Sequence, residues 1–139
     1  MATFKTTYRV AAADTDASGV VYIANYLYFF QRAEEDLYLN IGCNLQEIMD
    51  NYNIWIRKIE ASCRVKNHSK FNDLLEIEIK VNKIEERSIE YCFTLRQKKT
   101  GTIVAKGRVI EIAEDKQSGN IVNIPPDLLD KLKNFAGCS

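Results

Sequence analysis

Hydrophobic and polar residues alternate with a period of two along four stretches of the second half of the chain, as is typical of half-buried β-strands. These stretches predict strands at residues 54–66, 75–82, 88–96 and 104–113. The links at 85–87 and 98–101 are short enough for antiparallel hairpins, so we expect the four strands to form a meander. Frequent β-forming residues predict one more strand at 3–11.

A longer period, of three to four residues, runs from 25 to 41 and predicts one long helix. Gly42 follows directly, where a glycine commonly ends a helix. The apolar stripe is wide, so we expect other elements to cover the helix on more than one side; its residues are Leu27, Tyr28, Phe29, Phe30, Ala33, Leu37, Tyr38 and Ile41. Residues 44–53 have room for one short helical turn, and a short terminal helix is expected at 125–135, where prolines suit the first turn.

The order of the predicted elements, one strand, one long helix and then four strands, indicates an α+β fold. We expect a single domain over 1–139, with one antiparallel sheet wrapped around the central helix. Such a sheet has edges that need cover, which favours pairing of two chains through an edge strand.

The composition excludes several classes of protein. The chain has 139 residues, of which 46% are hydrophobic and 27% charged, the balance of a globular domain. Nineteen basic and nineteen acidic residues give no net charge, so general nucleic-acid binding is not expected. No apolar run approaches the length of a membrane span, and the first residues lack the apolar core of a secretory signal. We therefore expect a cytoplasmic protein without membrane contact.

Cysteine and histidine are too scattered to suggest a metal site, and we expect no metal and no cofactor. Cys43, Cys63, Cys92 and Cys138 are expected to be free thiols, with Cys63 and Cys92 as small buried residues. The single histidine, His68, lies in a polar run and is expected at the surface.

The segment from Asp14 to Tyr26 is the part of the sequence most suited to chemistry. Asp14 and Asp16 lie in a loop just before the long helix, and Gly19 allows a tight turn. Free N–H groups at the start of the helix can stabilise negative charge on an oxygen, while a nearby carboxylate attacks a carbonyl or activates water. The residues alone leave a second interpretation open, in which both aspartates only form turns and caps.

This segment closely resembles the active-site motif of the 4-hydroxybenzoyl-CoA thioesterase family, D-T-D-x-x-G-V-V-Y-H-x-x-Y. The chain has D-T-D at 14–16, G-V-V-Y at 19–22 and N-Y at 25–26, and the helix continues with F-F-Q-R-A. Residues 72–77 and 124–126 also resemble the family's turn into its third strand and its C-terminal I-P step. The resemblance implies the hot-dog fold, an acyl-CoA substrate, and a homodimer or homotetramer with sites between subunits.

The resemblance also implies roles for particular residues. Asp16 stands at the position of the catalytic carboxylate, which acts as nucleophile or general base, and the backbone N–H of Ile23 at that of the oxyanion donor. Asp14 is expected to order the loop by accepting backbone hydrogen bonds. The substrate-binding residues are expected to be Gly19, Val20, Tyr22, Asn25 and Tyr26.

Two positions depart from the family's usual pattern. Many members have histidine where this chain has Ile23, and tyrosine where it has Ala12. Both changes make this end of the pocket more apolar and roomier, which suggests a larger apolar or aromatic acyl group.

Other side chains have two interpretations each. The candidates for the CoA phosphates are Arg64, Lys66, Lys70 and Arg87, each of which is also an ordinary solvated charge. Tyr26, Phe30 and Trp55 line the acyl pocket or belong to the core, and for Trp55 we favour the core.

Two other functions remain open besides acyl-CoA hydrolysis. A non-catalytic acyl-CoA-binding domain would keep the same fold. A hot-dog dehydratase would need a histidine beside the carboxylate, and His68 lies outside the motif.

Overall fold

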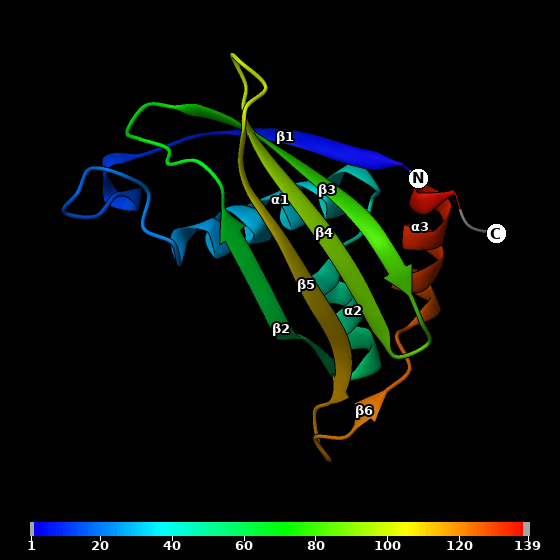
Figure 1. Ribbon diagram of the computed structural model, residues 1–139. Helices are drawn as coiled ribbons and strands as arrows, with labels where there is room; N and C mark the ends of the chain where they lie inside the picture. Colours follow the sequence, from blue (N-terminus) through cyan, green and yellow to red (C-terminus); the bar gives the residue numbers. More distant parts are fainter. Residues whose placement is uncertain (1, 138–139) are drawn as a thin grey trace.

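The structure is a computed structural model that describes residues 2–137. The chain forms the following elements in order: β1 (Thr3–Arg9), a 3₁₀ turn (Ala12–Asp14), α1 (Asn25–Asn40), α2 (Leu45–Tyr52), β2 (Ile54–Val65), β3 (Leu74–Ile84), β4 (Ser88–Gln97), β5 (Ile103–Asp115), β6 (Ile121–Val122) and α3 (Pro126–Ala136). Figure 1 shows a strongly curved sheet with α1 running across its concave side. This is the arrangement that the sequence predicts.

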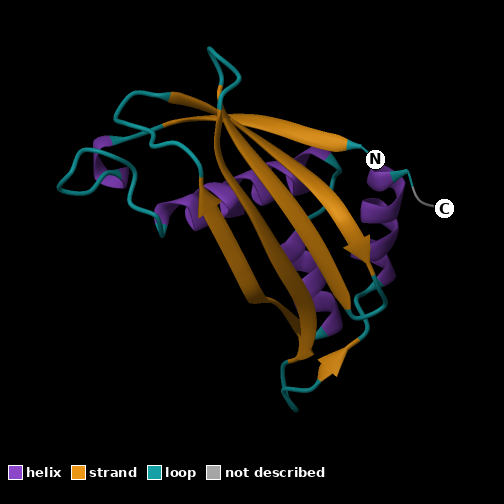
Figure 2. Cartoon of the chain, in the orientation of Figure 1, coloured by secondary structure: helices purple, strands orange, loops and turns teal. Residues whose placement is uncertain are grey.

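The strands do not follow one another as a simple meander. The sheet order is β1-β3-β4-β5-β2, with every pair antiparallel and the short β6 on β5 (Figure 2). Only β3, β4 and β5 form the predicted meander, because only their two links are hairpins. The link of eight residues from β2 to β3, 66–73, is long enough to pass across the sheet. The prediction that β2 pairs with β3 is therefore wrong.

The core lies between α1 and the concave face of the sheet. Alternate residues of β3 and β4 are fully buried, as the period of two predicts. The buried residues of α1 span a wide stripe, which confirms cover on more than one side; they are Tyr26, Phe29, Phe30, Ala33, Glu34, Leu37 and Tyr38. Glu34 is the one acidic residue in this stripe.

The ends of the long helix agree with the sequence signals. Two short elements, α2 and β6, differ from the prediction. Gly42, with φ of 71°, follows α1 as expected. The predicted single turn before β2 is the two-turn helix α2, which begins with the amide of Glu47 bonded to the Asn44 side chain at 3.2 Å. Strand β6 has only two residues, too few to give a periodic signal.

Strand β2 forms one edge of the sheet and faces no other strand of residues 2–137 on its outer side. A bulge at Ile59 shifts its pairing with β5, and the Ile59 side chain is 58% exposed. Trp55 is 38% exposed and carries Lys116 over its ring at 4.3 Å, so the expectation that Trp55 belongs to the core is wrong. An edge strand has fewer neighbours to cover its side chains, which explains both exposures.

Gly107 of β5 makes room for the ring of Phe30. This ring is stacked on Phe93 with centroids 4.5 Å apart, and a Cβ atom on Gly107 would overlap it. The same Cβ would lie 2.7 Å from the carbonyl oxygen of Ser62. The missing side chain therefore lets α1 approach the sheet.

We predict that Gly107→Ala destabilises the protein by about 1–3 kcal/mol, since overpacking forces Phe30 and the strand apart. Urea unfolding followed by circular dichroism measures the change. In a Phe30→Leu background the cost should be smaller, because the smaller side chain can move away. An equal cost in both backgrounds would show that Phe30 is not the reason for the glycine.

Candidate functional site

The loop between β1 and α1 is ordered by Asp14. One of its carboxylate oxygens accepts hydrogen bonds from the Ala11 amide at 2.8 Å and the Tyr8 hydroxyl at 3.0 Å. Its backbone carbonyl accepts from the Tyr22 amide at 3.0 Å and from the Asn25 side chain at 2.7 Å. Asp14 thus has the ordering role expected from the sequence, and it fixes the loop against the start of α1.

Asp16 lies at the exposed tip of this loop, in a tight turn closed by Gly19, whose φ is 83°. Its Oδ1 accepts hydrogen bonds from the hydroxyl and, at 2.8 Å, from the amide of Ser18. These two bonds hold the pKa of Asp16 below its usual value. Both Ser18 bonds go to Oδ1, and the backbone of Val20 also lies close enough to help lower this pKa, so Asp16 presents an ionised carboxylate at the loop tip.

The chain just before α1 carries two amides without partners. The amides of Tyr22 and Asn25 bond to Asp14 and Tyr22. Those of Ile23 and Ala24, between them, donate to no acceptor within residues 2–137. Such donors, at the positive end of a helix of 16 residues, are suited to an oxygen that gains negative charge.

Asp16 and Ile23 line the same surface cavity of about 530 Å³. Its other walls come from the loop and from the end of β2 with the link that follows; they are Ser18, Val20, Val21, Tyr22, Val65 and His68. Of the expected substrate-binding residues, Val20 and Tyr22 reach this cavity. Gly19 forms the turn beside it.

His68 is exposed, as expected, but it is not remote from Asp16, since both line this cavity. The link after β2 runs beside the loop, where the Val21 amide bonds to the Ser69 carbonyl at 2.8 Å. A histidine that lies outside the motif in the sequence thus lines the same cavity as the carboxylate in the fold. Nothing in the spacing of the sequence indicates this pairing of two irregular segments.

Asn25 and Tyr26 do not line the cavity. The Asn25 side chain is bonded within the loop, and the Tyr26 ring is 1% exposed with its hydroxyl 2.7 Å from Ser69 Oγ. Their hydrogen bonds hold the loop and the β2–β3 link in place, and their contact with substrate stays a prediction.

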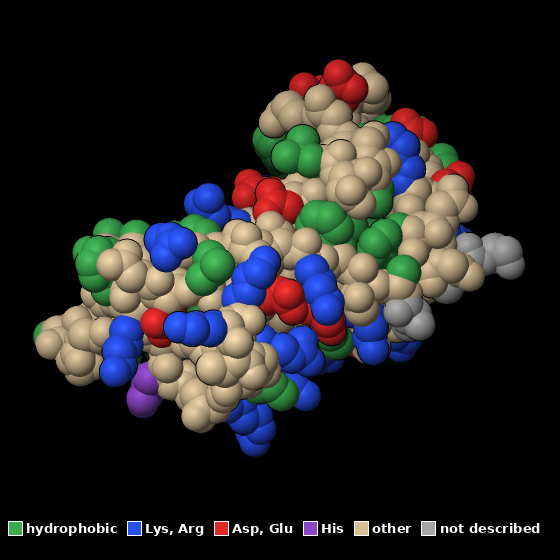
Figure 3. Space-filling model, turned by 90° about the horizontal axis from the view of Figure 1, so that it is seen from above, with side chains coloured by type: hydrophobic (Ala, Val, Ile, Leu, Met, Phe, Trp, Pro, Cys, Tyr) green, Lys and Arg blue, Asp and Glu red, His purple; other side chains and the backbone are tan. Residues whose placement is uncertain are grey.

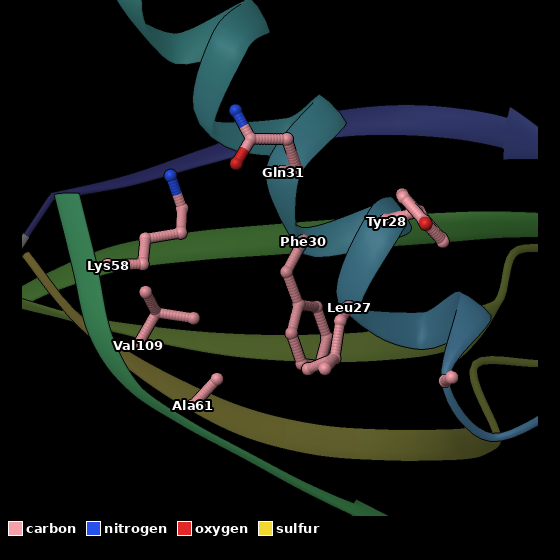
Figure 4. A pocket seen from close by; sticks show the side chains of 8 residues that line it. Leu27, Tyr28, Phe30, Gln31, Lys58, Ala61 and Val109 are labelled. Atoms are coloured by element: carbon pink, nitrogen blue, oxygen red, sulfur yellow. The ribbon is translucent and has the colours of Figure 1, made fainter. Parts of the chain in front are cut away.

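A second cavity, of about 370 Å³, adjoins the first at the start of α1, since Ile23 lines one and Ala24 the other. It lies between α1 and the inner side of β2 and β5 (Figure 4). Its lining is mostly apolar, with polar atoms on Gln31, Lys58 and the Tyr28 hydroxyl; the residues are Ala24, Leu27, Tyr28, Phe30, Gln31, Lys58, Ala61 and Val109. Phe30 is thus both a core residue and a wall of this cavity.

Behind Lys58 lies a buried polar cluster. The Lys58 ammonium is 3.0 Å from Glu111 Oε2 and 3.1 Å from Glu34 Oε2, and both glutamates are almost fully buried. The Tyr38 hydroxyl contacts both carboxyl groups, at 2.7 Å from Glu34 and 2.9 Å from Glu111, and lies 2.7 Å from the Tyr91 hydroxyl. Burial and the charge of Glu111 raise the pKa of Glu34 well above its ordinary value. The spacing of these residues along the sequence does not indicate the cluster, because they come from one helix and two different strands.

The four basic candidates for CoA phosphates are exposed and fall into two places. Arg64, Lys66 and Lys70 lie at the end of β2 and in the link after it, near the Asp16 cavity. Arg87 lies in the β3–β4 hairpin, which the pairing of Ser88 with Ile112 places at the opposite end of the sheet. Lys and Arg side chains also gather on the face seen in Figure 3. One chain therefore brings together three of the four.

The described cysteines, Cys43, Cys63 and Cys92, are free thiols. Cys63 and Cys92 are half-buried instead of fully buried. Cys138 lies outside the described residues. Within residues 2–137, no three metal-binding side chains come close enough to hold an ion, and no helix has the length and apolar character needed to cross a membrane.

Comparison with known proteins shows to which family the chain belongs. A profile of the thioesterase-like superfamily matches residues 10–132, which is most of the chain. The chain belongs to the thioesterase-like superfamily. This confirms the kind of family that the sequence motif suggests.

The chain is also similar to two proteins by sequence and to one solved structure by fold. The chain is 32% identical over 83 residues to a 1,4-dihydroxy-2-naphthoyl-CoA hydrolase of Thermosynechococcus vestitus, a match that covers 60% of this chain and 57% of that protein. It is 31% identical over 81 residues to the acyl-CoA thioesterase YbgC of Haemophilus influenzae, covering 58% and 60%. These matches span little more than half of each relative. The crystal structure of a 1,4-dihydroxy-2-naphthoyl-CoA thioesterase from Synechocystis superposes with a TM-score of 0.90 at 18% identity, over 96% of this chain and 97% of that one, which confirms the hot-dog fold.

We predict that the protein loses stability as the pH rises from 5 to 8, and that Glu34→Gln removes much of this loss. Because the pKa of Glu34 is raised on folding, the folded protein keeps a proton that the unfolded chain releases above about pH 4.3. Stability therefore falls with pH until the folded-state pKa is passed. Urea midpoints at several pH values measure the effect.

The matched control for this experiment is Glu35→Gln, at the next and exposed position of α1. It should keep the pH dependence of the wild-type protein. If Glu34→Gln keeps that dependence as well, Glu34 does not hold a proton in the folded state.

Proposed function

We propose that this protein is an acyl-CoA thioesterase in which Asp16 is the catalytic carboxylate and the Ile23 amide the oxyanion donor. The observation that carries the proposal is the shared cavity: Asp16, an ionised carboxylate, and Ile23, whose amide has no partner within residues 2–137, line the same hollow. The family membership and the names of the relatives support the same reaction class.

The proposed reaction begins with the thioester carbonyl oxygen against the Ile23 amide, with the Ala24 amide as a second donor. A single donor of this kind is worth about 3–4 kcal/mol of barrier. The Asp16 oxygen attacks the carbonyl carbon, the C–S bond breaks, and the CoA thiolate leaves. Water then hydrolyses the acyl-aspartyl anhydride to the free acid and restores the carboxylate.

A general-base mechanism is the other course open to the same group. Asp16 would then take a proton from water, hydroxide would add to the carbonyl, and the proton would pass to the leaving thiolate. The Ser18 hydrogen bonds lower the pKa of Asp16 and keep it ionised, as both courses require.

The two adjoining cavities suggest where each part of the substrate lies. The acyl group would enter the apolar cavity between α1 and β2, in agreement with the expected larger apolar or aromatic acyl group. The CoA phosphates would face Arg64, Lys66 and Lys70 beside the first cavity. Arg87 of the same chain is too distant, so a contact with CoA would require a second subunit.

A homodimer formed through β2 would complete the site. The outer edge of β2 has unpaired backbone groups, and Ile59 on it is largely exposed. Tyr22 and Ile23 at the first cavity are each more than half exposed, as is Tyr28 at the second. A second chain against this edge would cover these apolar side chains and exclude water from the site, whether or not dimers pair into tetramers.

We predict that Asp16→Asn lowers kcat for acyl-CoA hydrolysis by at least about a hundredfold, equivalent to about 2.7 kcal/mol. Release of free CoA thiol from acetyl-, octanoyl- and naphthoyl-CoA measures the rates. The two larger acyl groups should be cleaved faster than acetyl.

Asp115→Asn is a matched control, because Asp115 also caps a turn: its carboxylate accepts from the amides of Gln117 and Ser118, and its pKa is also lowered. The Asp115→Asn variant should hydrolyse acyl-CoA at the wild-type rate. Equal rates in the wild type and Asp16→Asn, with acyl-CoA still bound, would instead indicate the non-catalytic acyl-CoA-binding domain.

A further inference from the structure

The far end of the second cavity is polar, although its walls are apolar. Figure 4 shows the side chains of Lys58 and Gln31 at one end, beyond Leu27, Phe30, Ala61 and Val109. The half-buried Gln31 side chain takes part in none of the side-chain hydrogen bonds within residues 2–137. Two polar side chains thus line the cavity in which the proposed function places the acyl group.

The hydrogen bonds behind Lys58 determine the charge of this end. The Tyr38 oxygen has one proton and two lone pairs, yet it has three partners: Glu34, Glu111 and Tyr91. Tyr38 donates to one carboxylate and accepts from Tyr91. The remaining contact is satisfied only when the other carboxyl group carries a proton. The two glutamates therefore share one proton, and with Lys58 they form a cluster without net charge.

Lys58 keeps donor capacity for a ligand. Its ammonium donates a hydrogen bond to Glu111 at 3.0 Å and forms an ion pair with Glu34 at 3.1 Å, whose geometry leaves Glu34 Oε2 without a hydrogen bond. At least one of the three N–H groups of Lys58 is left for the cavity. The two buried carboxyl groups hold the ammonium in place, so this donor has a fixed position.

The distance from the reaction centre limits the length of the acyl group. Gln31 lies six residues after Asn25, the first residue of α1, which is about 9 Å along the helix; with the turn that carries Ile23 and Ala24, the polar end is about 12 Å from the proposed oxyanion donor. Along β2 the lining follows the same course, from Val65 at the first cavity to Ala61 and Lys58 at the second. This length suits a straight chain of about eight carbons or a bicyclic ring.

We propose that Lys58 and Gln31 select an acyl group that reaches about 12 Å and ends in an uncharged oxygen function, such as an ω-hydroxyl. This inference rests on the proposed thioesterase function and defines its substrate further. The terminal oxygen accepts a hydrogen bond from Lys58, and a hydroxyl also donates to the Gln31 carbonyl oxygen.

Acyl groups with other ends fit this arrangement less well. A plain hydrocarbon end strips water from Lys58 and Gln31 and replaces none of their hydrogen bonds. A carboxylate end meets the ammonium but also the negative charge shared by Glu34 and Glu111, and it must give up its own hydration. The uncharged oxygen avoids both costs.

Three CoA thioesters of one length test the proposal: 8-hydroxyoctanoyl-CoA, nonanoyl-CoA, in which a methyl group replaces the hydroxyl, and the monothioester of octanedioic acid. We expect kcat/KM to be at least tenfold higher for the hydroxyacyl substrate than for either of the others. A preference for nonanoyl-CoA or for the carboxylate would overturn the proposal.

Gln31→Leu tests the role of Gln31 in selecting the acyl group and leaves the buried cluster intact. Lys58→Met tests the role of the Lys58 ammonium. In Gln31→Leu, kcat/KM should fall for 8-hydroxyoctanoyl-CoA and rise for nonanoyl-CoA, a reversal that a folding defect cannot produce. The matched control is Gln117→Leu, in the exposed turn after β5. An unchanged ratio of the two substrates in Gln31→Leu and Lys58→Met would refute the role of both residues.

Failure of the proposed acyl-group selectivity can be distinguished from failure of the proposed thioesterase function. If Asp16 is needed for hydrolysis but the three substrates are cleaved alike, only the selectivity is refuted. If Asp16→Asn hydrolyses all of them as the wild type does, the thioesterase mechanism itself is refuted.

Discussion

The site depends on a property of every helix: its first amides have no acceptors within the helix. In this chain the segment before α1 is fixed by Asp14, which binds the Tyr22 amide and the Asn25 side chain through its carbonyl. The amides of Ile23 and Ala24 are left without partners within residues 2–137, and Ile23 lines a surface cavity. The same loop carries Asp16 to the wall of that cavity. One ordered loop thus carries both groups on which the proposed reaction depends, the Asp16 carboxylate and the unpartnered amides before α1.

The packing of α1 determines the space next to these donors. Gly107 lets the Phe30 ring lie flat against the sheet, and Phe30 forms a wall of the second cavity. At the far end, Glu34 projects from the buried side of α1 toward Lys58 on β2 and Glu111 on β5. Burying two carboxyl groups is unfavourable unless they are paired and hydrogen-bonded. Their hydrogen bonds with Tyr38 and Lys58 reduce this cost and link the helix to two strands.

The sequence predicts where helices and strands lie along the chain better than it predicts which strands pair in the sheet. Period-two and period-three-to-four patterns locate the strands and α1 because burial alternates with the same periods. The same patterns say nothing about which strand pairs with β2, since any apolar strand face can cover α1. The length of the 66–73 link was the only signal that β2 does not form a hairpin with β3.

Within the candidate site, only residues of one continuous segment of the sequence could be predicted. The resemblance pointed to Asp16 and Ile23, which the structure brings to one cavity, and to Asp14 as the ordering residue. His68 was missed because it reaches the cavity through a contact between two irregular segments. The Glu34–Lys58–Glu111 cluster was missed because its residues are far apart in the sequence, and each resembles an ordinary surface charge. Asn25 and Tyr26 match the motif, but their hydrogen bonds here hold the loop.

The most direct measurement of the central claim is a crystal structure of Asp16→Asn with an intact acyl-CoA. The account predicts that the thioester oxygen lies about 3 Å from the Ile23 amide nitrogen, that residue 16 faces the carbonyl carbon, and that the acyl group extends between α1 and β2. An acyl-CoA whose carbonyl lies elsewhere, with the Ile23 amide bonded to water or to another part of the ligand, would contradict it.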